Sequence, residues 1–278
     1  MRTICTLLFV WIVLGIQAQI PIVVKIEQRP SSQGVQPAFE VMVPQATATE
    51  AIDLWKETIM PKGLFKKGPK MEKVKDEWLV NNVLISDITS SPLNVITQVS
   101  SFTGNIYVRI FLQTETGFLG PVGSSPEAVD AANRYIRNYA VDLYRQAVTK
   151  ELRQEEKELK ELENSLGRLQ KQNRSYNKQI TEAQRDEKDL KNEALQNEEL
   201  LRSQQNMITL GNTTESGKEQ LEKQVKDTHK DIDKNKKEQY KYSRKVSKNE
   251  RDQRDKISAI ERQKMKVEEV RKKLGGIM

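Results

Sequence analysis

The sequence has very few of the side chains on which most active sites depend. Its 278 residues include one cysteine, Cys5, and one histidine, His229. This scarcity excludes disulfides within the chain and zinc sites built from cysteine and histidine. The carboxylates before residue 116 are scattered, so we predict a protein that is not an enzyme and has no catalytic residue, metal site or cofactor. A hydrolase that uses paired carboxylates alone is the enzymatic alternative.

Apolar residues are also scarce. Only 36% of the chain is hydrophobic and 6% is aromatic, whereas 31% is charged. A soluble domain usually has about 45–50% apolar and about 25% charged residues. The chain therefore has too little apolar surface for one compact core of its length. This composition predicts one modest core and a long, solvated helical element.

Long apolar runs are absent after the N-terminus. Arg2 precedes an eight-residue apolar run at residues 7–14, and Ala18 offers a small residue at a cleavage point. This order predicts a secretory signal peptide over residues 1–18. The run is shorter than the about 20 residues that span a bilayer, although an uncleaved membrane anchor is the alternative. We expect an exported protein, periplasmic or secreted, of a Gram-negative bacterium, and the mature chain would lack Cys5.

Residues 19–150 have the pattern of a small α+β head domain preceded by a short segment. In the N-terminal segment, 19–36, we expect an edge strand followed by a loop at residues 29–34. The head domain is predicted over residues 37–150, with a largely antiparallel sheet. Thr49 is the expected N-cap of its helix, which ends before Pro61. The predicted strands cover residues 39–43, 78–86, 94–100 and 105–113, where apolar and polar residues alternate or Val, Leu and Ile are frequent.

A long helix begins at Ser125 and Pro126, a strong combination for an N-cap and first helical position. From residue 152 its apolar residues narrow to a heptad seam, and a second seam follows a break near residues 209–217. Ser216 and Glu219 form a capping-box pattern for the second helix. The predicted seam residues are Leu152, Leu159, Leu162, Leu166, Leu169, Ile180, Leu190, Leu201, Val225, Ile232, Val246, Ile260, Val267 and Leu274.

Two observations favour an antiparallel coiled-coil hairpin over residues 151–278. The seams cover residues 152–208 and 218–274, which are 57 residues each. Residues 151–208 carry 11 Lys and Arg against 13 Asp and Glu, whereas residues 215–278 carry 20 against 13. Opposite net charge favours pairing of the two arms with each other. A parallel dimer of broken rods is the alternative.

A lysine-rich segment lies within the head. Six lysines fall within fourteen residues, opposed only by Glu72; they are Lys62, Lys66, Lys67, Lys70, Lys73 and Lys75. Such a segment is a candidate contact for an anionic surface. The alternative is a solvated loop, and His229 is likewise expected to be a solvated surface residue. Despite the net charge of +7, we expect no nucleic acid partner, because an exported protein rarely meets nucleic acid.

These observations predict an exported, non-enzymatic coiled-coil protein that acts as an envelope scaffold or protein-interaction module. Its protein partner is not identified by the sequence, and both a homo-oligomer and peripheral membrane contact are compatible with it. One alternative is a periplasmic holdase chaperone whose arms hold unfolded proteins. Another is a peripheral protein that binds an anionic surface through the lysine-rich segment.

Overall fold

A computed structural model describes residues 21–60, 69–209 and 215–277, which form two units. The head unit contains the residues up to Gln154 and those from Glu268 onward, and the hairpin unit contains Glu155–Val267. The predicted signal peptide lies outside the described residues. The elements are β1 (Val24–Ser31), β2 (Gly34–Pro44), α1 (Ala48–Ile59), β3 (Met71–Val74), β4 (Glu77–Val83), β5 (Leu93–Phe102), β6 (Asn105–Thr114), β7 (Gly117–Phe118), α2 (Pro126–Thr209) and α3 (Glu215–Gly275).

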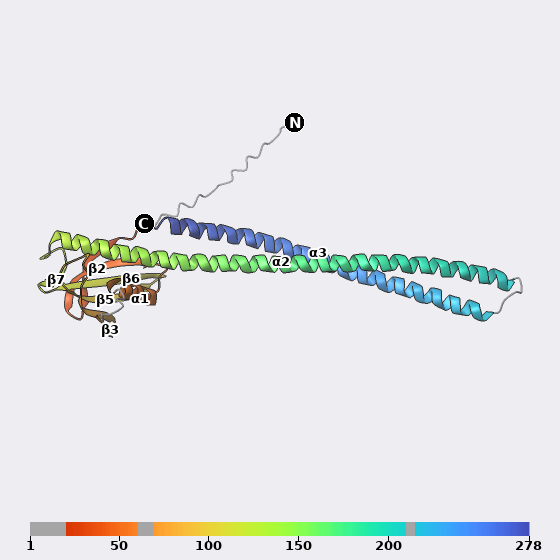
Figure 1. Ribbon diagram of the computed structural model, residues 1–278, viewed down its shortest axis with the longest axis horizontal. Coiled ribbons are helices and arrows are strands. Elements are labelled where there is room, and N and C mark those ends of the chain that lie inside the picture. Colours follow the sequence, from red (N-terminus) through yellow and green to blue (C-terminus); the bar gives the residue numbers. More distant parts are fainter. Residues whose placement is uncertain (1–20, 61–68, 210–214, 278) are drawn as a thin grey trace, which may run out of the picture. The chain divides into compact units, whose positions relative to one another are not determined.

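The head unit is built on one antiparallel sheet of seven strands (Figure 1). The strand order is β1-β2-β6-β5-β4-β3, and β7 pairs with the C-terminal end of β6. Alternation decides which residues face the core: Ile106, Val108 and Ile110 are buried on one face of β6, while Tyr107 and Arg109 point to the other. The predicted α+β class with a largely antiparallel sheet is confirmed.

One face of the sheet is covered by helices and holds the main core. Trp55 of α1 is fully buried, and its Nε1 donates a hydrogen bond to Thr97 Oγ1 of β5 at 2.8 Å. Tyr139 of α2 donates from its hydroxyl to the carbonyl oxygen of Ala51 at 2.8 Å, which ties the two helices together. The last turns of α3 join the same core through Val270. The end of α3 therefore returns to the head unit, as expected for two arms of equal length.

The other face is partly covered by the β1–β2 hairpin. β2 pairs with β6 only from Phe39 to Pro44, so its first residues are free to leave the sheet with β1. The backbone N–H of Ser32, in the turn after β1, donates to Glu77 Oε1 of β4 at 3.0 Å. A small second cluster is buried on this face and contains Ala38, Ile96 and Phe111. The hairpin thus closes over strands that are not its neighbours in the sheet.

Two predictions near the N-terminus are wrong in detail. Residues 29–31 continue β1 instead of forming a loop, because Pro30 lies on the edge strand, where a missing N–H is tolerated. The N-cap of α1 is Thr47, not Thr49. Its hydroxyl accepts from the Glu50 N–H at 3.3 Å, and the Glu50 side chain accepts from the Thr47 N–H at 2.9 Å. Thr49 falls inside the first turn.

Two further predictions need correction. Part of the lysine-rich segment, residues 71–74, forms β3, because it pairs with β4 despite its charge. At the far end of the chain, α3 begins at Glu215, so Ser216 lies within the first turn and not before it. The expected start of α2 is confirmed: Ser125 Oγ accepts from the N–H of Ala128 at 3.2 Å.

Within the hairpin unit, α2 and α3 run antiparallel, side by side (Figure 1). Gln263 contacts Glu155 at one end, Tyr242 stacks near Tyr176, and Gln239 contacts Ala183 farther along. Each step forward in α2 is thus matched by a step backward in α3. The predicted antiparallel coiled-coil hairpin is confirmed.

Candidate interaction surfaces

The lysine-rich segment is only partly described. Lys62, Lys66 and Lys67 lie outside the described residues. The other three lysines are exposed: Lys70 precedes β3, Lys73 is in β3 and Lys75 is in the β3–β4 turn. Lys73 Nζ lies 5.4 Å from the centre of the Trp78 ring, a cation–π contact across the strand pair.

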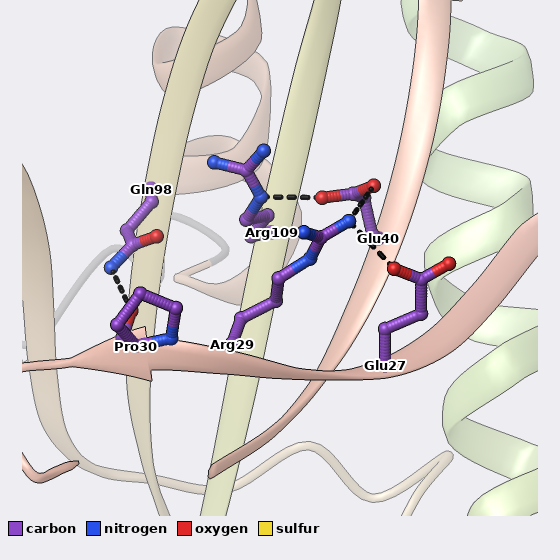
Figure 2. A network of polar contacts seen from close by, with 6 residues as sticks. All are labelled: Glu27, Arg29, Pro30, Glu40, Gln98 and Arg109. Atoms are coloured by element: carbon purple, nitrogen blue, oxygen red, sulfur yellow. Dashed lines mark hydrogen bonds and ion pairs between the residues drawn. The ribbon is translucent and has the colours of Figure 1, made fainter. Parts of the chain in front are cut away.

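The face of the sheet that the β1–β2 hairpin partly covers carries a network of charged side chains that the sequence did not indicate (Figure 2). Arg29 of β1 pairs with Glu27 at 2.6 Å and with Glu40 of β2 at 3.0 Å. Arg109 of β6 pairs with the other oxygen of Glu40. Gln98 of β5 donates to the carbonyl oxygen of Pro30 at 2.9 Å. The contacts of Arg109 and Gln98 hold the β1–β2 hairpin against the sheet, and the Arg29 pairs lie within the hairpin, so the network is structural.

Glu77 is the most buried carboxylate of this face, with 7% of its surface exposed. Its Oε1 accepts from the Ser32 N–H at 3.0 Å and from Gln98 Nε2 at 2.9 Å. Desolvation is the largest influence and acts to raise the Glu77 pKa. Hydrogen bonds from Ser32 and Gln98 and the charge of Lys75 together outweigh it and hold that pKa below its ordinary value.

The structure places all the predicted seam residues on buried or half-buried faces of α2 and α3. Leu152 and Leu274 pack against the core of the head unit. The others line the hairpin unit, where Ile232, Ile260 and Val267 are buried.

Several seam positions are polar, and their side chains bond across the hairpin. Gln239 Nε2 donates across the hairpin to Glu187 Oε2 at 2.5 Å, and within α3 it donates to Asn235 Oδ1 at 3.0 Å. Near the other end of the unit, Gln263 Nε2 donates to Glu155 Oε2 at 2.5 Å. The pKa of Glu187 is held below its usual range. The hydrogen bond from the Lys191 ammonium has the largest effect, and the hydrogen bond from Gln239 the next largest. Polar seam pairs of this kind favour one register over its neighbours.

An aromatic layer lies midway along the hairpin unit. The rings of Tyr176 and Tyr242 stack with centroids 6.4 Å apart. Lys245 Nζ lies 5.4 Å and 5.1 Å from the two ring centres, so it covers both rings. His229 lies nearer the start of α3 and is exposed, and its Nε2 is 3.2 Å from Glu198 Oε1. It is a surface residue of the hairpin.

The outer face of α3 carries an unbroken row of exposed cations, which we call the basic stripe. Successive members are four and three residues apart, a spacing that keeps them on one side of the helix. The basic stripe consists of Lys230, Lys234, Lys237, Lys241, Arg244, Lys248 and Arg251. Lys230 pairs with Asp227 at 2.8 Å, and it is the one member with an ion pair among the residues described.

A row of exposed carboxylates with the same spacing lies on α2 and is called the acidic stripe. It consists of Glu182, Asp186, Asp189 and Glu193. Glu182 pairs with Lys178 at 3.6 Å, whereas the other three form no ion pair within the described part of the chain. Neither stripe was predicted from the sequence, because the net charge of an arm does not show how its charges are arranged around the helix.

Within the described ranges, no cluster of three or more His, Cys, Asp or Glu side chains is placed to bind a metal ion. None of the helices in those ranges has an apolar stretch long enough to cross a bilayer. No protein-family model matches the chain, and comparison with curated proteins and with solved structures finds no significant similarity.

Proposed function

We propose that this chain is an exported, non-enzymatic scaffold protein whose hairpin unit makes protein–protein contacts. The supporting observation is the apolar surface left exposed on that unit. Leu195 and Leu200 of α2 are 60% and 56% exposed, and Tyr240 and Met265 of α3 are 67% and 65% exposed. Two paired helices have a single shared seam, so side chains outside it are available to further helices.

The proposal is tested by affinity capture from envelope extracts with the full chain as bait. A scaffold should retain one or two proteins in stoichiometric amounts. The pair Leu195→Ser and Leu200→Ser should remove them. The matched control is Phe102→Ser, because Phe102 is 69% exposed but belongs to the head unit. Retention of many unrelated unfolded proteins, with no stoichiometric partner, would instead favour the holdase chaperone.

The proposed export rests on the sequence of residues 1–18 and has its own test. Cleavage after Ala18 would leave Gln19 as the first residue. Mass spectrometry of the protein recovered from the envelope or the medium should find this N-terminus. Recovery of the intact chain from the membrane fraction would support the uncleaved anchor.

A second candidate function is contact of the head unit with an anionic surface. The exposure of Lys70, Lys73 and Lys75 along one short segment supports it. Binding to vesicles with and without anionic lipid should then fall in 1 M salt, where the screening length is ~3 Å. The variant Lys70→Glu with Lys75→Glu should weaken it, and equal binding to neutral vesicles would contradict this reading.

A further inference from the structure

The acidic and basic stripes lie outside the seam that joins α2 and α3. Each residue of the acidic stripe is exposed and immediately precedes a buried or half-buried residue of the α2 seam; these seam residues are Ala183, Glu187, Leu190 and Ala194. The basic stripe alternates in the same way with Ile232 and Gln239 of the α3 seam. Among the described residues, the ion pairs of both stripes stay within one helix, Glu182 with Lys178 and Lys230 with Asp227, and none joins α2 to α3.

The level at which residues of α2 and α3 meet is known from contacts in the hairpin unit. Partners have residue numbers that add to between 418 and 427: Glu155 with Gln263, Tyr176 with Tyr242, Ala183 with Gln239, Glu187 with Gln239, and Glu198 with His229. A second hairpin placed alongside without axial displacement would present its α3 at these same levels. A two-fold axis parallel to the helices produces that arrangement.

At this register each residue of the acidic stripe lies opposite a cation of the basic stripe. We propose that a second copy of this chain is a partner of the hairpin unit, with the acidic stripe of each copy against the basic stripe of the other. The residue numbers in each resulting pair add to 423, inside the observed range. The pairs are Glu182 with Lys241, Asp186 with Lys237, Asp189 with Lys234, and Glu193 with Lys230.

The complementarity continues beyond the stripes and changes sign on both helices together. Farther along the same row of α2 the charge becomes positive at Arg168, which the same sum of 423 places opposite Asp255. Two steps on, after Ser165 opposite Ser258, the same sum places Glu161 opposite Arg262. The remaining stripe cations, Arg244, Lys248 and Arg251, meet uncharged residues; these are Gln179, Ser175 and Gln172. Along this row there are six opposite-charge pairs and no like-charge pair.

This pattern favours a second copy over other partners. An anionic surface would attract the basic stripe but repel the acidic stripe and leave it unpaired. A symmetric dimer uses both stripes twice, because each contact is repeated by the two-fold axis. Exposed ion pairs are individually weak, so the dimer depends on many of them in register and is sensitive to salt. The inference rests on the proposed function in one respect, that the hairpin unit is the contact surface.

Sedimentation equilibrium of the full chain tests the proposal. We expect a dimer at low salt and at least about tenfold weaker association in 1 M NaCl. An α2 variant carries Asp186→Lys, Asp189→Lys and Glu193→Lys, and an α3 variant carries Lys230→Glu, Lys234→Glu and Lys237→Glu. Each variant alone should associate at least about tenfold more weakly. Their equal mixture should form heterodimers, because both contacts are then complementary again.

The controls separate register from net charge and from misfolding. Arg254→Glu, Lys264→Glu and Lys266→Glu remove the same number of exposed cations from α3 outside the row, and this variant should still dimerise. Circular dichroism should show unchanged helix content in every variant. In wild-type protein, carbodiimide should join Asp189 to Lys234 between isotopically labelled and unlabelled chains, which requires no variant to fold.

Three results would overturn the proposal. They are a wild-type monomer at every concentration, reversal variants that do not associate when mixed, and crosslinks confined to single chains. Sedimentation measures self-association alone. A monomer would therefore reject this inference while leaving the captured partner of the proposed function intact.

Discussion

Tyr139 and Tyr135 make the same kind of contact at two depths of the head core. Each hydroxyl donates to a carbonyl oxygen of α1: Tyr139 to Ala51 at 2.8 Å, and Tyr135 to Thr58 at 2.9 Å. Tyr139 is 2% exposed, whereas Tyr135 is half-buried. Burial raises the pKa of Tyr139 well above its ordinary value, since an ionised phenol there would lose hydration.

The variant Tyr139→Phe should lower the free energy of unfolding of the head unit by about 0.5–1.5 kcal/mol. The matched variant Tyr135→Phe should cost less, because water can replace the lost donor at a half-buried carbonyl. Urea unfolding followed by fluorescence measures both, since Trp55 and Trp78 lie in the head unit. A larger loss for Tyr135→Phe would contradict the difference in depth.

Glu77 makes head stability depend on acid pH. Because its folded pKa lies below its unfolded value, its contribution is present above about pH 4.5 and is lost as pH falls through the folded pKa. Glu77→Gln should be less stable by about 1.5–3 kcal/mol at pH 7, since charged hydrogen bonds to Ser32 and Gln98 are weakened. The same variant should lose less stability than wild type as the pH falls from 5 through the folded pKa of Glu77.

The matched control is Glu72→Gln, a change at an exposed carboxylate of the neighbouring strand β3. It should leave the acid dependence close to that of wild type. Unfolding free energies measured by urea at several pH values give both curves. If Glu77→Gln and wild type lost equal stability toward acid, the role assigned to Glu77 would be wrong.

At the scale of single elements, α1 provides a direct comparison of two possible caps. Thr47→Ala removes one half of the capping box with Glu50 and should cost about 0.5–2 kcal/mol. Thr49→Ala changes an exposed residue inside the first turn and should be neutral to within a few tenths of a kcal/mol. Unfolding followed by Trp55 fluorescence measures both. Equal costs would mean that the helix begins later than Thr47.

Local periodicity explains which elements the sequence could predict. The alternation in β6 and the heptads in α2 and α3 are patterns that repeat within each element, so a single residue of the wrong polarity does not hide them. Caps and turns depend on one or two residues. The sequence does distinguish the two threonines, because Thr47 is followed three residues later by Glu50, the capping-box pattern, whereas Thr49 is followed by Ile52. Pro30 and its polar neighbours suggested a loop because the sheet edge that tolerates proline is defined only by the strand order.

Contacts between distant residues could not be predicted in the same way. Glu40 and Arg109 are 69 residues apart and meet because β2 and β6 are neighbours in the sheet. The stripes are a mixed case. Their charges and spacing are readable along each helix, but their match depends on the register between α2 and α3. That register comes from contacts such as Gln239 with Ala183.

At the scale of the whole chain, α2 and α3 each contribute to both units. Their ends in the head unit are tied by Lys273, which pairs with Glu151 at 2.9 Å, and by Val270 in the core. In the hairpin unit the same two helices have a partly polar seam, so hydrophobic burial is weaker there. The antiparallel register is therefore maintained by apolar contacts in the head unit and by polar pairs in the hairpin unit.

A disulfide within the hairpin unit tests that register in a single chain. With Cys5 replaced by serine, Ala183→Cys and Gln239→Cys place two thiols at contacting seam positions. We expect oxidation to link them within one chain at any protein concentration. The 55 residues enclosed would raise the stability of the hairpin by about 4 kcal/mol on loop-closure grounds. Non-reducing electrophoresis and thermal unfolding measure the two effects.

The control pair, Ala183→Cys with Val225→Cys, shifts one thiol by about 20 Å along α3 and should stay reduced or link between chains. Ready interchain linkage between equal positions, 183 to 183 and 239 to 239, in 1 M NaCl would instead indicate parallel rods, because each helix would then lie beside the same helix of the other chain.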